Sequence, residues 1–249
     1  MKLDKIVAER EHKTVYRDGN RCIKMFDESY RKADILNEAL NQARIEETGL
    51  RVPKLLEVTV INGRWAIVSE FIEGETLASL VLKHPEKHDE YMERFVDIQL
   101  DIQSHTCGML NTLTEKMQHK ISASALDATA RYELHTRLAA MPVHRKVCHG
   151  DFRPSNIIIT PEDEAYVIDW AHVTQGNASA DAARTYLLFY LHGEEKSAEQ
   201  YLNLFCKKSD TARQYVQKWI PIVAASQSVK GKPEEKEFLL RWANVVEYE

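Results

Sequence analysis

The chain has 249 residues, enough for one large domain or for two lobes that share a cleft. Its net charge is -5 and its charge runs are mixed in sign, so it lacks the clustered Lys and Arg that nucleic-acid binding requires. No stretch approaches the roughly 18–20 apolar residues of a membrane-spanning helix, so no membrane association is expected. The N-terminal segment does not resemble a signal peptide and the four cysteines form no CxxC pair, so we expect a cytoplasmic protein with reduced thiols.

The N-terminal part of the chain carries the alternating pattern of β-strands. Residues 13–26 alternate around Asp18-Gly19, which predicts a hairpin because Gly tolerates positive φ. From Glu28 to about Thr48 the apolar residues recur three and four positions apart, which predicts a helix. Residues 54–71 predict a second hairpin through Asn62-Gly63. With residues 5–9 as a first strand, the expected order is strand, strand, strand, helix, strand, strand.

The rest of the chain has a mostly helical pattern. It follows a break at Gly74, and Thr76 lies near the expected start of a helix. Three short segments have the length of strands, at residues 146–148, 157–160 and 165–168. The sequence therefore predicts an α+β fold with two lobes, a small antiparallel β-sheet lobe over residues 1–73 and a larger, mostly helical lobe over residues 74–249.

Polar residues that suit phosphoryl transfer lie around these short strands, in "VCHGDFRPSNIIIT" and "AYVIDW". Asp151 and Asn156 are five residues apart, and Asp169 follows Asn156 by thirteen. In phosphoryl transfer an Asp orients the substrate hydroxyl and takes its proton, while an Asn and a second Asp hold magnesium. Magnesium prefers a few protein oxygens together with phosphate oxygens and water, so this sparse set fits it better than zinc.

The segment "HGDFRPSN" followed by "IDW" resembles the aminoglycoside phosphotransferase family of small-molecule kinases, within the protein-kinase-like superfamily. The resemblance rests on residue order, spacing and flanking strands together. It implies a protein-kinase-like bilobal fold with an N-terminal nucleotide-binding lobe and a C-terminal catalytic and substrate-binding lobe. It also implies that Asp151 is the catalytic base, that Asn156 and Asp169 bind magnesium, and that His149 braces the loop.

Two further residue sets extend the resemblance. Lys24, on the expected third strand, and Glu38, in the following helix, resemble the kinase ion pair in which the lysine contacts the α- and β-phosphates of the nucleotide. Arg153 occupies the place of a kinase lysine near the transferred phosphate. We hypothesise that it stabilises charge on the γ-phosphoryl group, the alternative being that it only braces the loop.

The chain also carries a helix start, "DAART", that resembles bacterial members of the family. Its Asp181 and Arg184 are expected to brace the metal loop or the helical lobe. One feature departs from the kinase pattern, because the expected phosphate-covering loop "AEREHKTVY" contains no glycine. Either side chains such as Lys13 or Thr14 replace the glycine cradle, or the loop stays open, or nucleotide binding is weak.

Together these features predict an ATP- or GTP-dependent phosphotransferase that uses Mg²⁺ and moves the γ-phosphate to a hydroxyl of a small molecule. The acceptor would be an aminoglycoside-like antibiotic, an amino alcohol or a sugar, and the protein a monomer or homodimer. The alternatives are a protein kinase, which the missing glycine loop and APE segment disfavour, and a catalytically weak nucleotide-binding scaffold. Acidic residues that would suit a cationic acceptor are Asp97, Asp101, Asp127, Glu133, Glu247 and Glu249.

Overall fold

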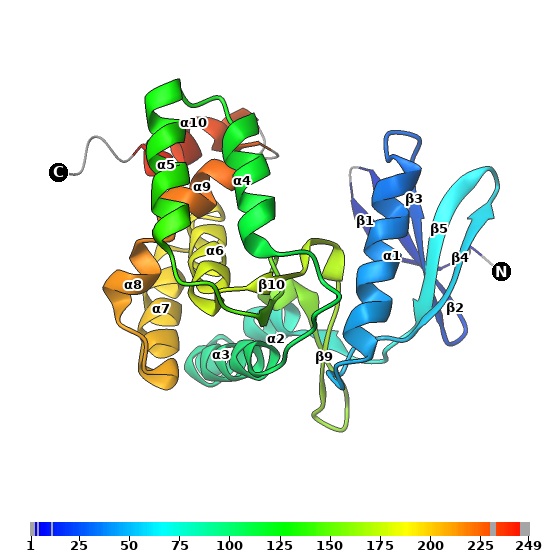
Figure 1. Ribbon diagram of the computed structural model, residues 1–249. Helices are drawn as coiled ribbons and strands as arrows, with labels where there is room; N and C mark the ends of the chain where they lie inside the picture. The colour runs from blue at the N-terminus through cyan, green and yellow to red at the C-terminus, as the bar shows by residue number, and fades with distance from the viewer. Residues whose placement is uncertain (1–2, 4, 11, 230–232, 245–249) are drawn as a thin grey trace. The chain divides into compact units, whose positions relative to one another are not determined.

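The computed structural model describes residues 3, 5–10, 12–229 and 233–244 (Figure 1). The chain divides into two compact units. Unit 1 comprises Met1–Pro85 and Pro154–His172, and unit 2 comprises Glu86–Arg153 and Val173–Glu249. One division between the units thus falls inside the segment "HGDFRPSN". The lobe boundary at residue 73 stays a prediction.

Unit 1 contains a five-stranded antiparallel sheet in the order β1-β2-β3-β5-β4. Both predicted hairpins are present. Gly19 turns β2 into β3 with φ of 58°, and Asn62 and Gly63 turn β4 into β5 with φ of 51° and 79°. The strands are β1 (Lys5–Arg10), β2 (Lys13–Asp18), β3 (Arg21–Phe26), β4 (Leu55–Ile61) and β5 (Arg64–Glu70).

The predicted helix is α1 (Lys32–Glu46), which lies against one face of this sheet (Figure 1). Its buried Ile35 and Ala39 pack on Phe26 of β3 and Ile67 of β5. The helix begins after the predicted start at Glu28. Asp27 is the reason, because its carboxylate accepts hydrogen bonds from the backbone N–H and the hydroxyl of Ser29, which favours a turn over a helix.

The side chains of β3 alternate between the two faces of the sheet, and this alternation determines on which face Lys24 lies. Its neighbours Ile23 and Met25 are buried against Ala66 and Val68 on one face of the sheet. Because successive side chains of a strand point to opposite faces, Lys24 lies on the face that α1 covers. The strand therefore presents a lysine to the helix.

The remaining elements of unit 1 form a small antiparallel sheet in the order β6-β8-β9. Gly74 precedes β6 with φ of 155°, and a Cβ there would lie 2.3 Å from the carbonyl oxygen of Ile159, so only glycine allows the pairing. Thr76 caps α2, because its hydroxyl accepts from Ser79 N at 3.1 Å. The elements are β6 (Glu75–Thr76), α2 (Leu77–Lys83), η2 (Pro154–Asn156), β8 (Ile157–Ile159), β9 (Ala165–Val167) and η3 (Trp170–His172).

Unit 2 is mostly helical, with one short sheet in which β7 (Lys146–Cys148) pairs with β10 (Thr174–Gly176). Its helices are α3 (His88–Ser104), α4 (Leu113–Ala123), α5 (Ala128–Ala140), α6 (Ala178–Leu191), α7 (Glu195–Ser209), α8 (Arg213–Gln217), α9 (Ile220–Ser228) and α10 (Pro233–Ala243). A short 3₁₀ turn, η1 (Pro85–Lys87), lies where the units divide.

The core of unit 2 is aromatic around α3. Phe95 stacks on Phe152 with ring centroids 4.5 Å apart, and it meets Phe189 and Tyr201 edge-on at 5.8 and 5.7 Å. Phe152 belongs to the segment "HGDFRPSN", so this core holds the polar motif in place.

The α+β fold class predicted from the sequence is confirmed by the antiparallel sheet of unit 1 and the helices of unit 2. The strands at residues 146–148, 157–159 and 165–167 were also predicted. Strands β6 and β10 were not, because Glu75–Thr76 and Thr174–Gly176 contain no apolar residues that would indicate a buried strand. Among the described residues no helix is both long and apolar enough to cross a membrane.

Candidate active site

Four charged side chains meet on the α1 face of the sheet in unit 1. Lys24 of β3 pairs with Glu38 of α1, and its Nζ also donates to Asp169 Oδ1 at 3.0 Å. The Nζ of Lys13, at the start of β2, lies 3.4 Å from Asp169 Oδ2. Asp169 thus receives an ammonium group on each oxygen. The sequence-predicted pair of Lys24 and Glu38 is therefore in contact, and it has Asp169 and Lys13 beside it.

Burial and charge act in opposite directions within this cluster. Burial alone would raise the pKa of Asp169, but the ammonium groups of Lys24 and Lys13 outweigh it and hold that pKa far below its usual range. Burial alone would lower the pKa of Lys24, and Asp169 and Glu38 outweigh it in turn and raise that pKa. The carboxylate of Asp169 and the ammonium of Lys24 are consequently both charged at neutral pH.

The two predicted magnesium ligands are neighbours in unit 1. The backbone N–H of Ile168 donates to the carbonyl oxygen of Asn156 at 2.9 Å, which ties the residue before Asp169 to Asn156. Asn156 is buried, and Asp169 has a φ of 66°. This left-handed conformation is uncommon for residues other than glycine, and Asp and Asn tolerate it best. The backbone bond therefore places the turn of Asp169 next to Asn156.

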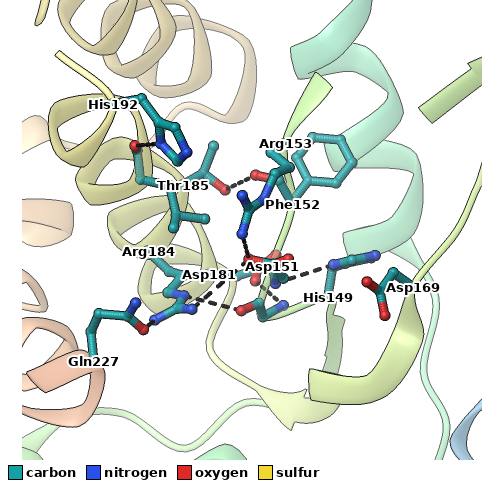
Figure 2. Close-up of polar contacts among 12 residues, drawn as sticks. His149, Asp151, Phe152, Arg153, Asp169, Asp181, Arg184, Thr185, His192 and Gln227 are labelled. Carbon is teal, nitrogen blue, oxygen red and sulfur yellow. Dashed lines mark hydrogen bonds and ion pairs between the residues drawn. The ribbon is translucent and has the colours of Figure 1, made fainter. Parts of the chain in front are cut away.

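The segment that carries Asp151 lies in unit 2 and follows β7 (Figure 2). The backbone N–H of Asp151 donates to Nδ1 of the fully buried His149 at 3.1 Å. Arg153 Nη2 donates to Asp151 Oδ1 at 2.6 Å, and Arg184 Nη2 lies 3.9 Å from the same oxygen. Burial would raise the pKa of Asp151, but the two guanidinium groups outweigh it and lower that pKa. The carboxylate is ionised and oriented.

Helix α6 holds this loop through three side chains (Figure 2). Asp181 accepts from Gly150 N at 2.7 Å, Arg184 Nε donates to Gly150 O at 3.0 Å, and Thr185 Oγ1 donates to Phe152 O at 3.2 Å. Positions 181, 184 and 185 share one face of a helix. Gly150 itself has a φ of 77°, which suits glycine. Asp181 and Arg184, expected to have a bracing role, do hold the loop.

Comparison with known families supports the same assignment as the motif. The sequence model of the phosphotransferase enzyme family matches residues 5–217, which is most of the chain. The chain belongs to this phosphotransferase family. It is accordingly an enzyme, a phosphotransferase with an alcohol group as acceptor. No curated protein matches the sequence.

Solved structures of other phosphotransferases share the fold of this family member at low sequence identity. An aminoglycoside-3'-phosphotransferase of type VIII is 16% identical with a TM-score of 0.67, over 89% of this chain and 93% of that one. Aminoglycoside phosphotransferase APH(4)-Ia is 14% identical with a TM-score of 0.68, over 96% and 89%. The choline kinase LicA from Streptococcus pneumoniae is 16% identical with a TM-score of 0.61, over 96% and 87%.

Two buried amide side chains support Asp181 in this phosphotransferase, and they were not among the residues predicted from the sequence. Gln99 and Gln103 of α3 donate to Asp181 Oδ2 at 3.2 and 3.3 Å, and Tyr201 donates to Gln99. All three residues are buried, and Asp181 is only 1% exposed. The signal was present, since two Gln four residues apart interrupt the apolar stripe of α3. A polar pair on a buried helix face indicates a buried partner.

Proposed function

We propose that this phosphotransferase moves the γ-phosphate of ATP or GTP to a hydroxyl of a small molecule. The observation that carries the proposal is the double pairing of Lys24 with Glu38 and Asp169. A lysine fixed between a helix carboxylate and a metal-binding carboxylate is the arrangement that kinases require for phosphate binding. In this proposal Lys24 contacts the α- and β-phosphates, and Glu38 keeps its ammonium group in place.

The residues of unit 1 fit a magnesium ion by their donor chemistry. Asn156 and Asp169 offer amide and carboxylate oxygens, which Mg²⁺ prefers, and the rest of its shell would come from phosphate oxygens and water. When bound, the ion neutralises charge on the nucleotide phosphates. Asn156 and Asp169 are therefore the proposed ligands, supported by the backbone bond that joins their turns.

Asp151 is the proposed catalytic base. Its ionised carboxylate would accept a hydrogen bond from the acceptor hydroxyl and take its proton as the bond from the acceptor oxygen to the γ-phosphorus forms. The bond from the γ-phosphorus to the β–γ bridging oxygen breaks at the same time, and the nucleoside diphosphate leaves with both electrons. The hydrogen bonds of α6 to the loop support this role, because a base must be held in position before the substrate arrives.

The acceptor class is proposed as an aminoglycoside, an amino alcohol or a sugar. APH(4)-Ia has been solved as a ternary complex with AMP-PNP and hygromycin B, and LicA is a choline kinase. Of the acidic residues considered for a cationic acceptor, Asp97 pairs with Lys208 at 2.7 Å and Asp127 caps α5 through Ala130 N at 2.8 Å. Glu247 and Glu249 lie outside the described residues. Monomer or homodimer remains a prediction.

Calorimetry of wild-type protein with ATP and GTP, with and without magnesium, tests whether the protein binds a nucleotide as phosphate donor. We expect magnesium-dependent binding that weakens by about 100-fold or more in Asp169→Ala, because the variant loses a charged ligand of the proposed metal ion. The matched control is Asp163→Ala, an exposed residue of the β8–β9 turn. Absence of binding to either nucleotide would contradict the proposed use of ATP or GTP as phosphate donor.

Arg153 is proposed to stabilise charge on the transferred phosphoryl group. Its Nε atom is buried and has no hydrogen-bond partner in the described part of the chain, so the side chain has donor capacity beyond its pair with Asp151. We expect Arg153→Ala to lower kcat about 10- to 100-fold, as for loss of one charge-assisted hydrogen bond. Arg153→Lys should recover part of that loss. An unchanged kcat in Arg153→Ala would assign the arginine to bracing alone.

A further inference from the structure

The connection between β1 and β2 carries none of the glycines of a phosphate-binding loop. Arg10 of β1 pairs with Lys13 of β2, so two residues join the strands. The chain has no glycine before Gly19. A glycine-rich loop binds phosphates because its backbone N–H groups approach the oxygens closely. Another group must therefore supply donors to the β- and γ-phosphates if this protein binds a nucleotide.

Lys13 begins β2 at the end of this connection, and the residue before it, His12, contacts Asp27. The backbone N–H of Asp27 donates to the carbonyl oxygen of His12 at 3.1 Å, and the His12 ring contacts the Asp27 carboxylate at 2.9 Å. Lys13 itself pairs with Phe26 across the ladder. The backbone of Lys13 thus lies between Arg10 of β1 and Phe26 of β3, which fixes the point from which its side chain extends.

The ammonium group of Lys13 shares a carboxylate with Lys24. Lys24 has two carboxylate partners, Glu38 and Asp169, whereas the ion pair of Lys13 in the described chain is with Asp169, at 3.4 Å. Its side chain is 20% exposed, so water and ligands reach it. Asp169 is also the proposed magnesium ligand. A cation on that carboxylate would displace Lys13 from it and leave its ammonium group for another anion.

We propose that Lys13 is a second phosphate-binding lysine, which replaces the glycine-rich loop by contacting the terminal phosphates of the donor nucleotide. A lysine serves this purpose well because its ammonium is a compact charge with three donors on a flexible stem. The inference rests on the proposed function, since it names how the donor is held at that site. The competing role is structural, with Lys13 only neutralising Asp169.

The two roles differ in how the loss of Lys13 depends on the number of phosphates. We would titrate Lys13→Gln with adenosine, ADP and ATP, each with magnesium, by calorimetry. We expect ATP binding to weaken about 10- to 100-fold, as for one charge-assisted hydrogen bond, with a smaller loss for ADP and a change below about 2-fold for adenosine. Lys13→Arg should remain within about 5-fold of wild type, and the exposed Lys5→Gln on β1 is the control.

Three results would overturn the proposal. ATP affinity within about 2-fold of wild type in Lys13→Gln would remove Lys13 from phosphate binding while the proposed function stands. An equal loss for adenosine and ATP would assign it the structural role. No binding of any nucleotide by wild-type protein would overturn the proposed function and this inference with it. Thermal melting of each variant checks folding, and Lys13→Met, which keeps the aliphatic stem, takes the place of Lys13→Gln if that variant does not fold.

Discussion

Asp151→Asn is expected to slow phosphoryl transfer by about 10²- to 10⁴-fold, the usual contribution of a positioned general base. Asparagine has nearly the same size, so the hydrogen bond from Arg153 and the path of the loop are retained. What is lost is the negative charge that receives the hydroxyl proton. Nucleotide affinity should stay within about 3-fold of wild type, because Lys24 and the proposed magnesium ligands belong to unit 1 and Asp151 itself has no proposed contact with the nucleotide.

The rate is measured as ADP formation from ATP with hygromycin B and choline as first acceptors, and with slow hydrolysis by water as the reference without acceptor. Asp163→Asn is the matched control, since this exposed aspartate has φ of 65°, which Asn also tolerates. A kcat of Asp151→Asn equal to that of the control would show that Asp151 does not act as the base.

Asp181→Ala is expected to lower the free energy of unfolding by about 2–4 kcal/mol. The carboxylate accepts hydrogen bonds from Gly150 N, Gln99 Nε2 and Gln103 Nε2. Its removal leaves Gly150 N without this acceptor, and each amide loses one of two acceptors, keeping Thr185 Oγ1 for Gln99 and Ala178 O for Gln103. Each buried donor without a partner costs about 1–3 kcal/mol, and local rearrangement recovers part of the total. The loop should also lose its fixed path, so kcat should fall with stability.

Urea unfolding followed by circular dichroism measures this change. Asp97→Ala is the control, because Asp97 makes an exposed ion pair with Lys208 and its loss should cost at most about 1 kcal/mol. Asp181→Asn separates charge from shape, since its amide oxygen still accepts from Gly150 N. A stability of Asp181→Ala equal to that of Asp97→Ala would mean that the network around Asp181 does not hold the loop.

The hairpins, helix α1 and the short strands of the motif could be predicted because each has a local signal. Asn62-Gly63 and Asp18-Gly19 are turn sequences whose backbone conformation the residues themselves favour. The start of α1 was predicted too early because the pattern of apolar spacing does not reveal the turn that Asp27 makes with Ser29. Strands β6 and β10 exist through pairing with distant segments, which no local pattern records.

In the candidate active site, too, contacts between segments far apart in the sequence could not be predicted. The contact of Lys24 with Glu38 could be predicted because their fourteen-residue spacing and their elements match a known arrangement. The approach of Lys13 to Asp169 could not, since the two residues are 156 positions apart and no local pattern records the contact. The partners of Asp181 likewise come from a helix about 80 residues earlier in the chain.

The contacts that α6 makes with the loop reach main-chain atoms: Gly150 N, Gly150 O and Phe152 O. Arg184 also approaches the side chain of Asp151, at 3.9 Å. These three anchors therefore do not involve the side chains at positions 151 and 153, and the ring of His149 adds a contact with Asp151 N from within the loop. Substitutions at 151 and 153 leave these anchors intact, so a change in turnover there reports on chemistry and not on misfolding of the loop. Substitutions at 181, 184 and 185 remove the anchors and keep the side chains of Asp151 and Arg153. The helix and the loop therefore allow the position of the catalytic residues and their chemistry to be changed separately.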